Sequence, residues 1–242
     1  MEGYLVLNKN LNIVITGTSR GVGYELTKKF LGKGNKVWGC SRGKTNINQK
    51  NYFHTKIDLC DEFKIEKWVK KIEKETNKNI DIFISNSSIF NRNLNSLETD
   101  LSIVETVKIN LLAPILLTKY ISRCMIKNKK GTIIFFSSIA SILDEIGTST
   151  YASSKSGLET FSNIIKKELN AFKIKLNIFR ILYVSTKLSN ELNKKQIINL
   201  KKKFKSNKFG TVNKIFNKII KIHYKKGNLA NTLLYDNYKN KV

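Results

Sequence analysis

The stretch TGTSRGVG, residues 16–23, follows a short apolar run and precedes an amphipathic segment. Its glycines, Gly17, Gly21 and Gly23, allow a tight turn from a strand into a helix, because glycine adopts backbone conformations that other residues avoid. The first N–H groups of a helix are unpaired and lie at the positive end of its dipole, so such a turn favours phosphate groups. The spacing GxxxGxG differs from the GxGxxG of the commonest dinucleotide fingerprint, and glycines that only serve a turn are the alternative.

Apolar runs alternate with longer amphipathic stretches along the whole chain, which is typical of strands and helices around a parallel sheet. We expect strands near 11–16, 36–41, 53–57, 81–86, 131–137, 174–181 and 232–235, and helices near 21–33, 62–76, 101–127, 150–171, 190–205 and 211–225. No linker or repeat divides this series. The sequence therefore predicts an α/β fold: one Rossmann-type domain over residues 1–242, a doubly wound parallel sheet of about seven strands with helices on both faces and a ligand crevice at the carboxyl ends of the strands.

The composition is strongly basic, with 44 Lys and Arg against 18 Asp and Glu and a formal net charge of +26. Such a charge could indicate a nucleic acid or an anionic membrane surface as partner. Only five of the basic residues are arginine, and residues 187–226 hold thirteen lysines against the single acid Glu191. We interpret this run as solvated helix faces and expect no specific nucleic-acid site.

Three cysteines, Cys40, Cys60 and Cys124, are widely spaced and form no CxxC pair, so neither a disulfide framework nor a zinc site is indicated. The two histidines lie far apart, and we expect no metal. No apolar run approaches 18 residues, and the start of the chain lacks the pattern of a signal peptide. We therefore expect a cytoplasmic protein without a membrane span.

The second expected strand ends in GCSRG, where dinucleotide folds usually carry an acidic residue that binds the ribose hydroxyls. Arg42 at this place would instead attract a 2′-phosphate, and Arg20 in the glycine turn favours the same ligand. These residues predict NADP(H) rather than NAD(H) as the cofactor. An ordinary exposed loop arginine is the alternative for Arg42.

The stretch YASSKSG, residues 151–157, places Tyr151 four residues before Lys155 on an expected helix, one turn apart on one face. Reduction of a ketone by hydride transfer leaves an alkoxide that needs a proton, and a tyrosine with a pKa near 10 matches neutral pH poorly. The Lys155 ammonium would lower the pKa of Tyr151 by stabilising the phenolate. Taken alone, the pair is more typical of an exposed helix surface than of a proton-transfer site.

The two motifs together, TGxxxGxG and YxxxK about 130 residues later, resemble the classical short-chain dehydrogenase/reductase family from Leu11 to about Asp236. The segments IDL, VKINLLAP and FFSSIAS carry further matches to it. The resemblance implies an oxidoreductase that interconverts a ketone and a secondary alcohol, with Tyr151 as general acid or base. It implies the catalytic residues Asn110, Ser138, Tyr151 and Lys155, and cofactor-binding residues Gly17, Ser19, Arg20, Gly21, Val22, Gly23, Arg42, Asp58, Leu59, Asn86, Tyr151, Lys155 and Thr186.

Three segments depart from the pattern of the family. The family's NNAG appears as SNSS at residues 85–88, Ile181 and Leu182 stand in place of Pro-Gly, and the last strand ends in DNY rather than Gly-Gly. These departures support one alternative function, a catalytically silent dinucleotide-binding sensor or scaffold. The charge alone supports a second alternative, a nucleic-acid or membrane-surface protein on the same fold.

The resemblance also carries expectations about substrate and assembly. The variable segment 183–210 would cover a small carbonyl or alcohol substrate, which its lysines suggest is anionic. A solvated helix pair is the equal alternative for this segment. The helices near 101–127 and 150–171 would form a homodimer or homotetramer. Pro114 lies inside the first of these helices and cannot donate a hydrogen bond to the Asn110 carbonyl. The freed carbonyl could hold a water, and the resemblance implies that a water at this asparagine links Lys155 to solvent protons. A proline merely tolerated near a helix bend is the alternative.

Overall fold

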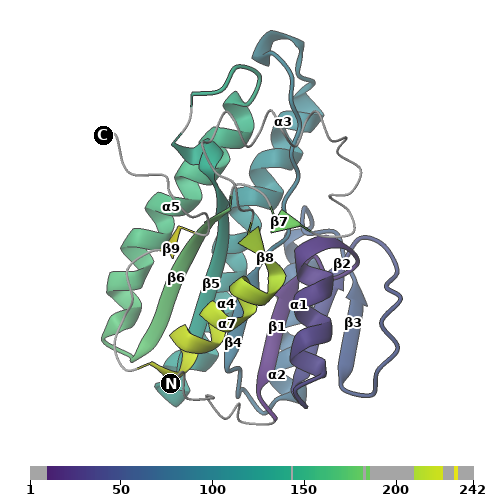
Figure 1. Ribbon diagram of the computed structural model, residues 1–242, viewed down its shortest axis with the longest axis vertical. Coiled ribbons are helices and arrows are strands. Elements are labelled where there is room, and N and C mark those ends of the chain that lie inside the picture. The colour runs from purple at the N-terminus through teal and green to yellow at the C-terminus, as the bar shows by residue number, and fades with distance from the viewer. Residues whose placement is uncertain (1–9, 143, 182–183, 186–209, 226–231, 234–242) are drawn as a thin grey trace.

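The computed structural model describes residues 10–142, 144–181, 184–185, 210–225 and 232–233 (Figure 1). Its main sheet consists of seven parallel strands: β1 (Asn12–Thr16), β2 (Lys36–Ser41), β3 (Tyr52–Lys56), β4 (Ile82–Ser85), β5 (Gly131–Ser138), β6 (Ile174–Ile181) and β9 (Thr232–Leu233). Their order across the sheet is β3-β2-β1-β4-β5-β6-β9. The predicted doubly wound fold is confirmed, and its order reverses between β1 and β4, where such sheets bind ligands.

Helices cover both faces of this sheet, as Figure 1 shows. On one face lie α1 (Gly21–Leu31) and α7 (Val212–Tyr224), and on the other lie α2 (Glu62–Glu75), α4 (Ala113–Asn128) and α5 (Ser149–Asn170). Successive strand residues point to opposite faces. Ile13 and Ile15 therefore pack with α1 and α7, whereas Val14 between them packs with the other helices. Apolar runs without alternation, such as IVI, are the consequence of this two-sided burial.

The helix expected over 101–127 is interrupted in the structure. It consists of α3 (Asp100–Val107), a π turn η2 (Lys108–Leu112) and α4, with Pro114 in the first turn of α4. Proline cannot donate to the carbonyl four residues earlier, so regular α-helical hydrogen bonding breaks at the place that Pro114 predicts. The segment Asp100–Asn128 is long and apolar enough to cross a membrane by length and composition. Leu117 and Ile121 of this segment nevertheless lie in the hydrophobic core. Core helices of soluble proteins commonly meet the same criteria of length and composition.

Other expectations have mixed outcomes. Strand and helix boundaries in the described ranges agree with the predicted ones within about two residues, while the expected helix 190–205 lies outside the described residues. The sequence did not predict a short parallel pair, β7 (Val184–Ser185) with β8 (Gly210–Thr211), at the two ends of the variable segment.

The three cysteines are free thiols. Among the residues placed by the structure, no three His, Cys, Asp or Glu side chains gather as metal ligands would.

Candidate active site

The glycine turn between β1 and α1 has the backbone that its sequence predicts. Gly17 and Gly21 have φ angles of +75° and +63°, in the left-handed region that favours glycine. A Cβ atom on Gly23 would lie 2.3 Å from the Gly17 carbonyl oxygen, so this position needs glycine for the close approach of helix and turn. No side chain caps the N-terminus of α1. Its first N–H groups are therefore available to an anion.

Asn86 at the end of β4 holds this turn in place. Its Nδ2 donates to the carbonyl oxygens of Thr16 at 2.9 Å and of Gly17 at 3.2 Å. In return, the Thr16 hydroxyl oxygen accepts hydrogen bonds from the backbone N–H groups of Asn86 and Ser87, each at 3.0 Å. Asn86, the residue that the SNSS segment retains, thus joins the two strands on either side of the switch point.

A cavity of about 600 Å³ opens at this switch point. Its volume is in the range of small-molecule and cofactor sites. Most of the predicted cofactor-binding residues line it: Gly17, Ser19, Arg20, Gly21, Val22, Arg42, Asp58, Leu59 and Asn86. Gly23 lies behind the lining and shapes the turn, and Thr186 lies outside the described residues. The cradle of uncapped N–H groups and the volume of the cavity fit a nicotinamide dinucleotide.

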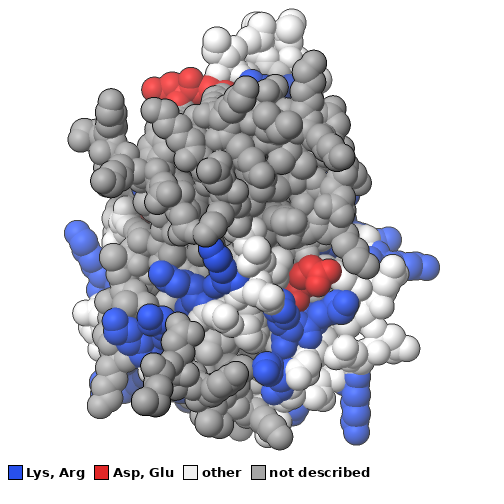
Figure 2. All heavy atoms as spheres, viewed as in Figure 1, with Lys and Arg blue, Asp and Glu red and all other residues white. Residues whose placement is uncertain are grey.

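Basic side chains dominate one end of this cavity. Arg20, Arg42 and Lys44 are exposed on its lining, where Asp58 is the one acidic residue. Figure 2 shows Lys and Arg at several separate places on the described part of the face in view. Most of the lysine-rich run 187–226 lies outside the described residues, so its interpretation as solvated helix faces stays a prediction.

Tyr151 lies in the first turn of α5, largely buried. Burial raises the pKa of its hydroxyl, and hydrogen bonds with the hydroxyls of Ser138 and Ser88 act in the opposite direction. The Phe90 ring meets the Tyr151 ring edge to face, with 4.8 Å between centroids. Because Ser88 lines the cavity, its contact places the tyrosine hydroxyl beside the cavity.

Lys155 is 2% exposed and donates a hydrogen bond of 3.0 Å to the Phe136 carbonyl oxygen of β5. Its ammonium nitrogen lies 5.8 Å from the centre of the Tyr151 ring. Burial lowers the pKa of Lys155 to about 8, although the nearby Glu159 carboxylate acts to raise it. In this structure the Lys155 ammonium bonds to a carbonyl, and burial dominates the pKa of the Tyr151 phenol. That Lys155 lowers the pKa of Tyr151 stays a prediction.

Asn110 is fully buried in the middle of the π turn. Its Oδ1 accepts from the Ser88 hydroxyl at 3.0 Å and from the Ile89 N–H at 2.9 Å. Its Nδ2 donates to the Ile89 carbonyl oxygen at 2.9 Å and to the Ser154 hydroxyl at 3.2 Å. The asparagine therefore joins the segment after β4 to the helix of the tyrosine and lysine. The water expected at its backbone carbonyl stays a prediction.

The structure adds residues that the sequence reasoning missed. Ser88 was counted only as a departure from the family pattern, yet its hydroxyl contacts both Tyr151 and Asn110. Its position just beyond the carboxyl end of a strand was the available signal. Glu159 and Arg180 form a buried ion pair next to the site, and no motif in the sequence indicated it.

Comparisons with known proteins agree with this geometry. The family profile described as short chain dehydrogenase matches residues 11–197. The 3-oxoacyl-acyl-carrier-protein reductase FabG of Buchnera aphidicola subsp. Schizaphis graminum is 32% identical over 213 residues, covering 86% of this chain and 87% of the relative. The reductase of the same name from Escherichia coli strain K12 is 24% identical, covering 85% of this chain and 86% of the relative.

Solved structures share the fold. A 4-hydroxyisoleucine dehydrogenase complexed with NADH has a TM-score of 0.86 at 21% identity, covering 93% of this chain and 97% of that one. A short chain dehydrogenase from Leptospira borgpetersenii with bound NAD⁺ has a TM-score of 0.81 at 20% identity, covering 94% and 92%. With a profile that spans most of its length and a relative above 30% identity, the chain belongs to the short-chain dehydrogenase/reductase family.

Proposed function

We propose that the protein is an NADP(H)-preferring oxidoreductase that interconverts a ketone and a secondary alcohol, with Tyr151 as general acid or base. The observation that carries the proposal is a half-buried tyrosine hydroxyl next to the hydroxyls of Ser138 and Ser88, beside a cavity of cofactor size. The bound cofactor would supply a hydride to the carbonyl carbon, which leaves negative charge on the substrate oxygen. Tyr151 would then give this oxygen its proton.

The other residues have supporting roles in this proposal. Ser138 ends β5 within hydrogen-bonding reach of Tyr151, so its hydroxyl could hold the substrate oxygen next to the acid. Lys155 would place a positive charge near the phenolate that forms as the proton leaves. Because the pKa of Tyr151 is raised, its protonated form dominates at neutral pH.

The substrate, the cellular location and the oligomeric state are also proposals. The relatives are named as reductases of 3-oxoacyl groups on an acyl carrier protein, so 3-oxoacyl thioesters are the first ketones to test. An anionic substrate under the segment 183–210 would agree with the lysines there, although most of this segment lies outside the described residues. We propose a cytoplasmic homodimer or homotetramer that binds neither nucleic acid nor membranes specifically, and gel filtration of the purified protein tests the assembly.

Replacing Arg42 with alanine tests the cofactor preference. The variant is expected to raise KM for NADPH by about tenfold, because a charge-assisted bond from an exposed side chain to the 2′-phosphate is lost. KM for NADH should change by less than about twofold, since that cofactor has no phosphate at this place. Initial rates with both cofactors at fixed ketone concentration provide the measurement.

Arg123→Ala is the matched control, because Arg123 is an exposed arginine on α4, which covers the sheet away from the cavity. Its KM values for both cofactors should equal those of the unchanged protein. An Arg42→Ala variant that weakens NADPH and NADH equally would contradict the proposed phosphate contact. A protein that prefers NADH from the start would overturn the NADP(H) assignment.

A further inference from the structure

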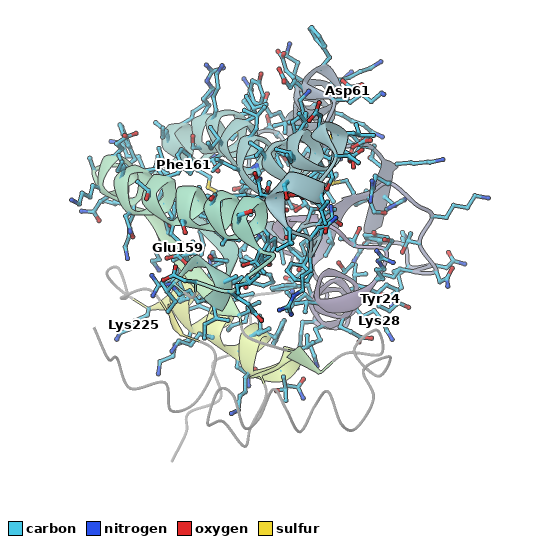
Figure 3. All side chains as sticks on the ribbon, turned by 90° about the horizontal axis from the view of Figure 1, so that it is seen from above. Tyr24, Lys28, Asp61, Glu159, Phe161 and Lys225 are labelled. Atoms are coloured by element: carbon cyan, nitrogen blue, oxygen red, sulfur yellow. The ribbon has the colours of Figure 1, made fainter. Side chains whose placement is uncertain are left out.

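Glu159 is a buried carboxylate one helical turn beyond Lys155 on α5. It is 7% exposed, and Figure 3 shows it on the side of α5 opposite to Phe161. The Phe161 ring packs at the edge of the core between α5 and β5. A buried acid is costly unless it is paired and hydrogen bonded, so the surroundings of Glu159 need an explanation.

Three elements provide its partners. Oε1 accepts hydrogen bonds from the Ser137 hydroxyl of β5 at 2.7 Å and from the Ser141 hydroxyl of the short helix η3 (Ile139–Ser141) at 2.6 Å. The Arg180 guanidinium of β6 donates through Nε at 2.8 Å and 2.9 Å and forms the ion pair at 2.5 Å. Burial alone would raise the pKa of Glu159, but these donors hold it below its ordinary value. Glu159 is therefore ionised at neutral pH.

These contacts converge on Ser138. Ser137 precedes it in β5 and pairs in register with Arg180 of β6. The Ser141 hydroxyl lies 2.8 Å from the Ser138 carbonyl oxygen as well as 2.6 Å from Glu159. A hydroxyl has one proton, so Ser141 donates to one of these acceptors at a time. The carboxylate thus ties both flanks of Ser138 to the helix that carries Tyr151 and Lys155.

Glu159 also acts on Lys155 through its charge. Lys155 lies one turn earlier on the same helix, and β5 offers its ammonium only a neutral carbonyl, that of Phe136. The short helix η3 contributes the Ser141 hydroxyl, and Arg180 of β6 is paired with Glu159. Tyr151 on α5 is protonated and neutral. Asn110 of the π turn is an amide, and among the described residues no charge on α3 or α4 acts on the pKa of Lys155 as Glu159 does.

We propose that Glu159, paired with Arg180, is a positioning residue of the proton-transfer site: it fixes Ser138 against α5, and its negative charge favours the ammonium form of Lys155. The proposal rests on the proposed function for its kinetic part. Its electrostatic part concerns the titration of Lys155 and can be measured without any turnover.

The test compares Glu159→Gln with Glu168→Gln, which removes the same charge from an exposed position on the same helix. The pKa of Lys155 is followed through its 13Cε resonance, which is assigned by its loss in Lys155→Arg. In Glu159→Gln this pKa should fall by on the order of one pH unit from about 8. The alkaline limb of kcat/KM for ketone reduction should move to lower pH by the same amount, because activity needs the ammonium. Glu168→Gln should change neither quantity.

A double variant, Glu159→Leu with Arg180→Leu, serves if the single variant does not fold. Apolar residues in place of a buried ion pair commonly preserve stability, and the variant still lacks the carboxylate near Lys155. Its Lys155 pKa should also fall, by less than in Glu159→Gln because Arg180 is no longer left unpaired. An unchanged titration of Lys155 in either folded variant, or an equal shift in Glu168→Gln, overturns the proposal. A shifted titration in a protein without ketone reductase activity would instead refute the proposed function alone.

Discussion

Replacing Tyr151 with phenylalanine is expected to lower kcat for ketone reduction by about 10²- to 10⁴-fold, the usual contribution of a general acid. The ring would keep its edge-to-face contact with Phe90, so the fold should change little. The affinity for NADPH should also be nearly unchanged, because the tyrosine lies outside the glycine turn and Arg42, which we propose to hold the phosphates. NADPH oxidation with a panel of 3-oxoacyl thioesters and other ketones measures the rate, and calorimetric titration measures the affinity.

Tyr24→Phe is the control for this experiment. Tyr24 lies on α1 beside Lys28, away from Ser138, and its variant should keep full activity. Substantial activity in Tyr151→Phe would exclude the tyrosine as the acid. A native protein that binds NADPH tightly but reduces no ketone would favour the alternative of a silent dinucleotide-binding protein.

Replacing Gly23 with alanine should weaken NADPH binding by about a hundredfold and lower the melting temperature. The added Cβ would lie 2.3 Å from the Gly17 carbonyl oxygen and 2.5 Å from Asn86 Nδ2. The first of these atoms is backbone, so the whole turn must move, at a cost of about 3 kcal/mol. Displacing the turn also misplaces the N–H groups that would hold the pyrophosphate.

Gly32→Ala provides the matched control at the other end of α1. Gly32 is exposed with a right-handed helical backbone, and its added Cβ would lie 3.3 Å from the nearest atom, the Lys28 carbonyl oxygen. This variant should bind NADPH as the unchanged protein does. Unaltered affinity in Gly23→Ala would show that the turn does not hold the cofactor.

Local sequence patterns predicted most of the sheet and the cavity. Apolar runs such as IVI and the glycines of TGTSRGVG determine the backbone of their own and neighbouring residues. Their effect can therefore be predicted from the local sequence alone. The nine predicted residues around the cavity come together because parallel strands end at one edge. Arg42 reaches this edge from the end of β2 and Asp58 from the end of β3.

The features that sequence reasoning missed depend on contacts between distant elements. Glu159 and Arg180 lie 21 residues apart and meet only because β6 is placed beside β5 and beneath α5. The pKa of Tyr151 depends mainly on how far the fold buries the phenol. The Ser88 hydroxyl has Asn110 as its partner only because the fold packs the π turn against the loop after β4. Each of these is a tertiary effect that no spacing rule contains.

The π turn at Lys108–Leu112 has a consequence for the phase of the helices on either side. A π turn accommodates one residue more than an α-helical turn, and each residue advances an α-helix by roughly 100°. This extra residue lets α3 and α4 aim different sides inward within one continuous helix, with the Asn110 amide directed at Ser88 and Ile89. Deleting a single residue there would let the segment close as a regular α-helix and would remove the bulge that carries Asn110. The length of this segment, more than its composition, therefore determines where the asparagine points.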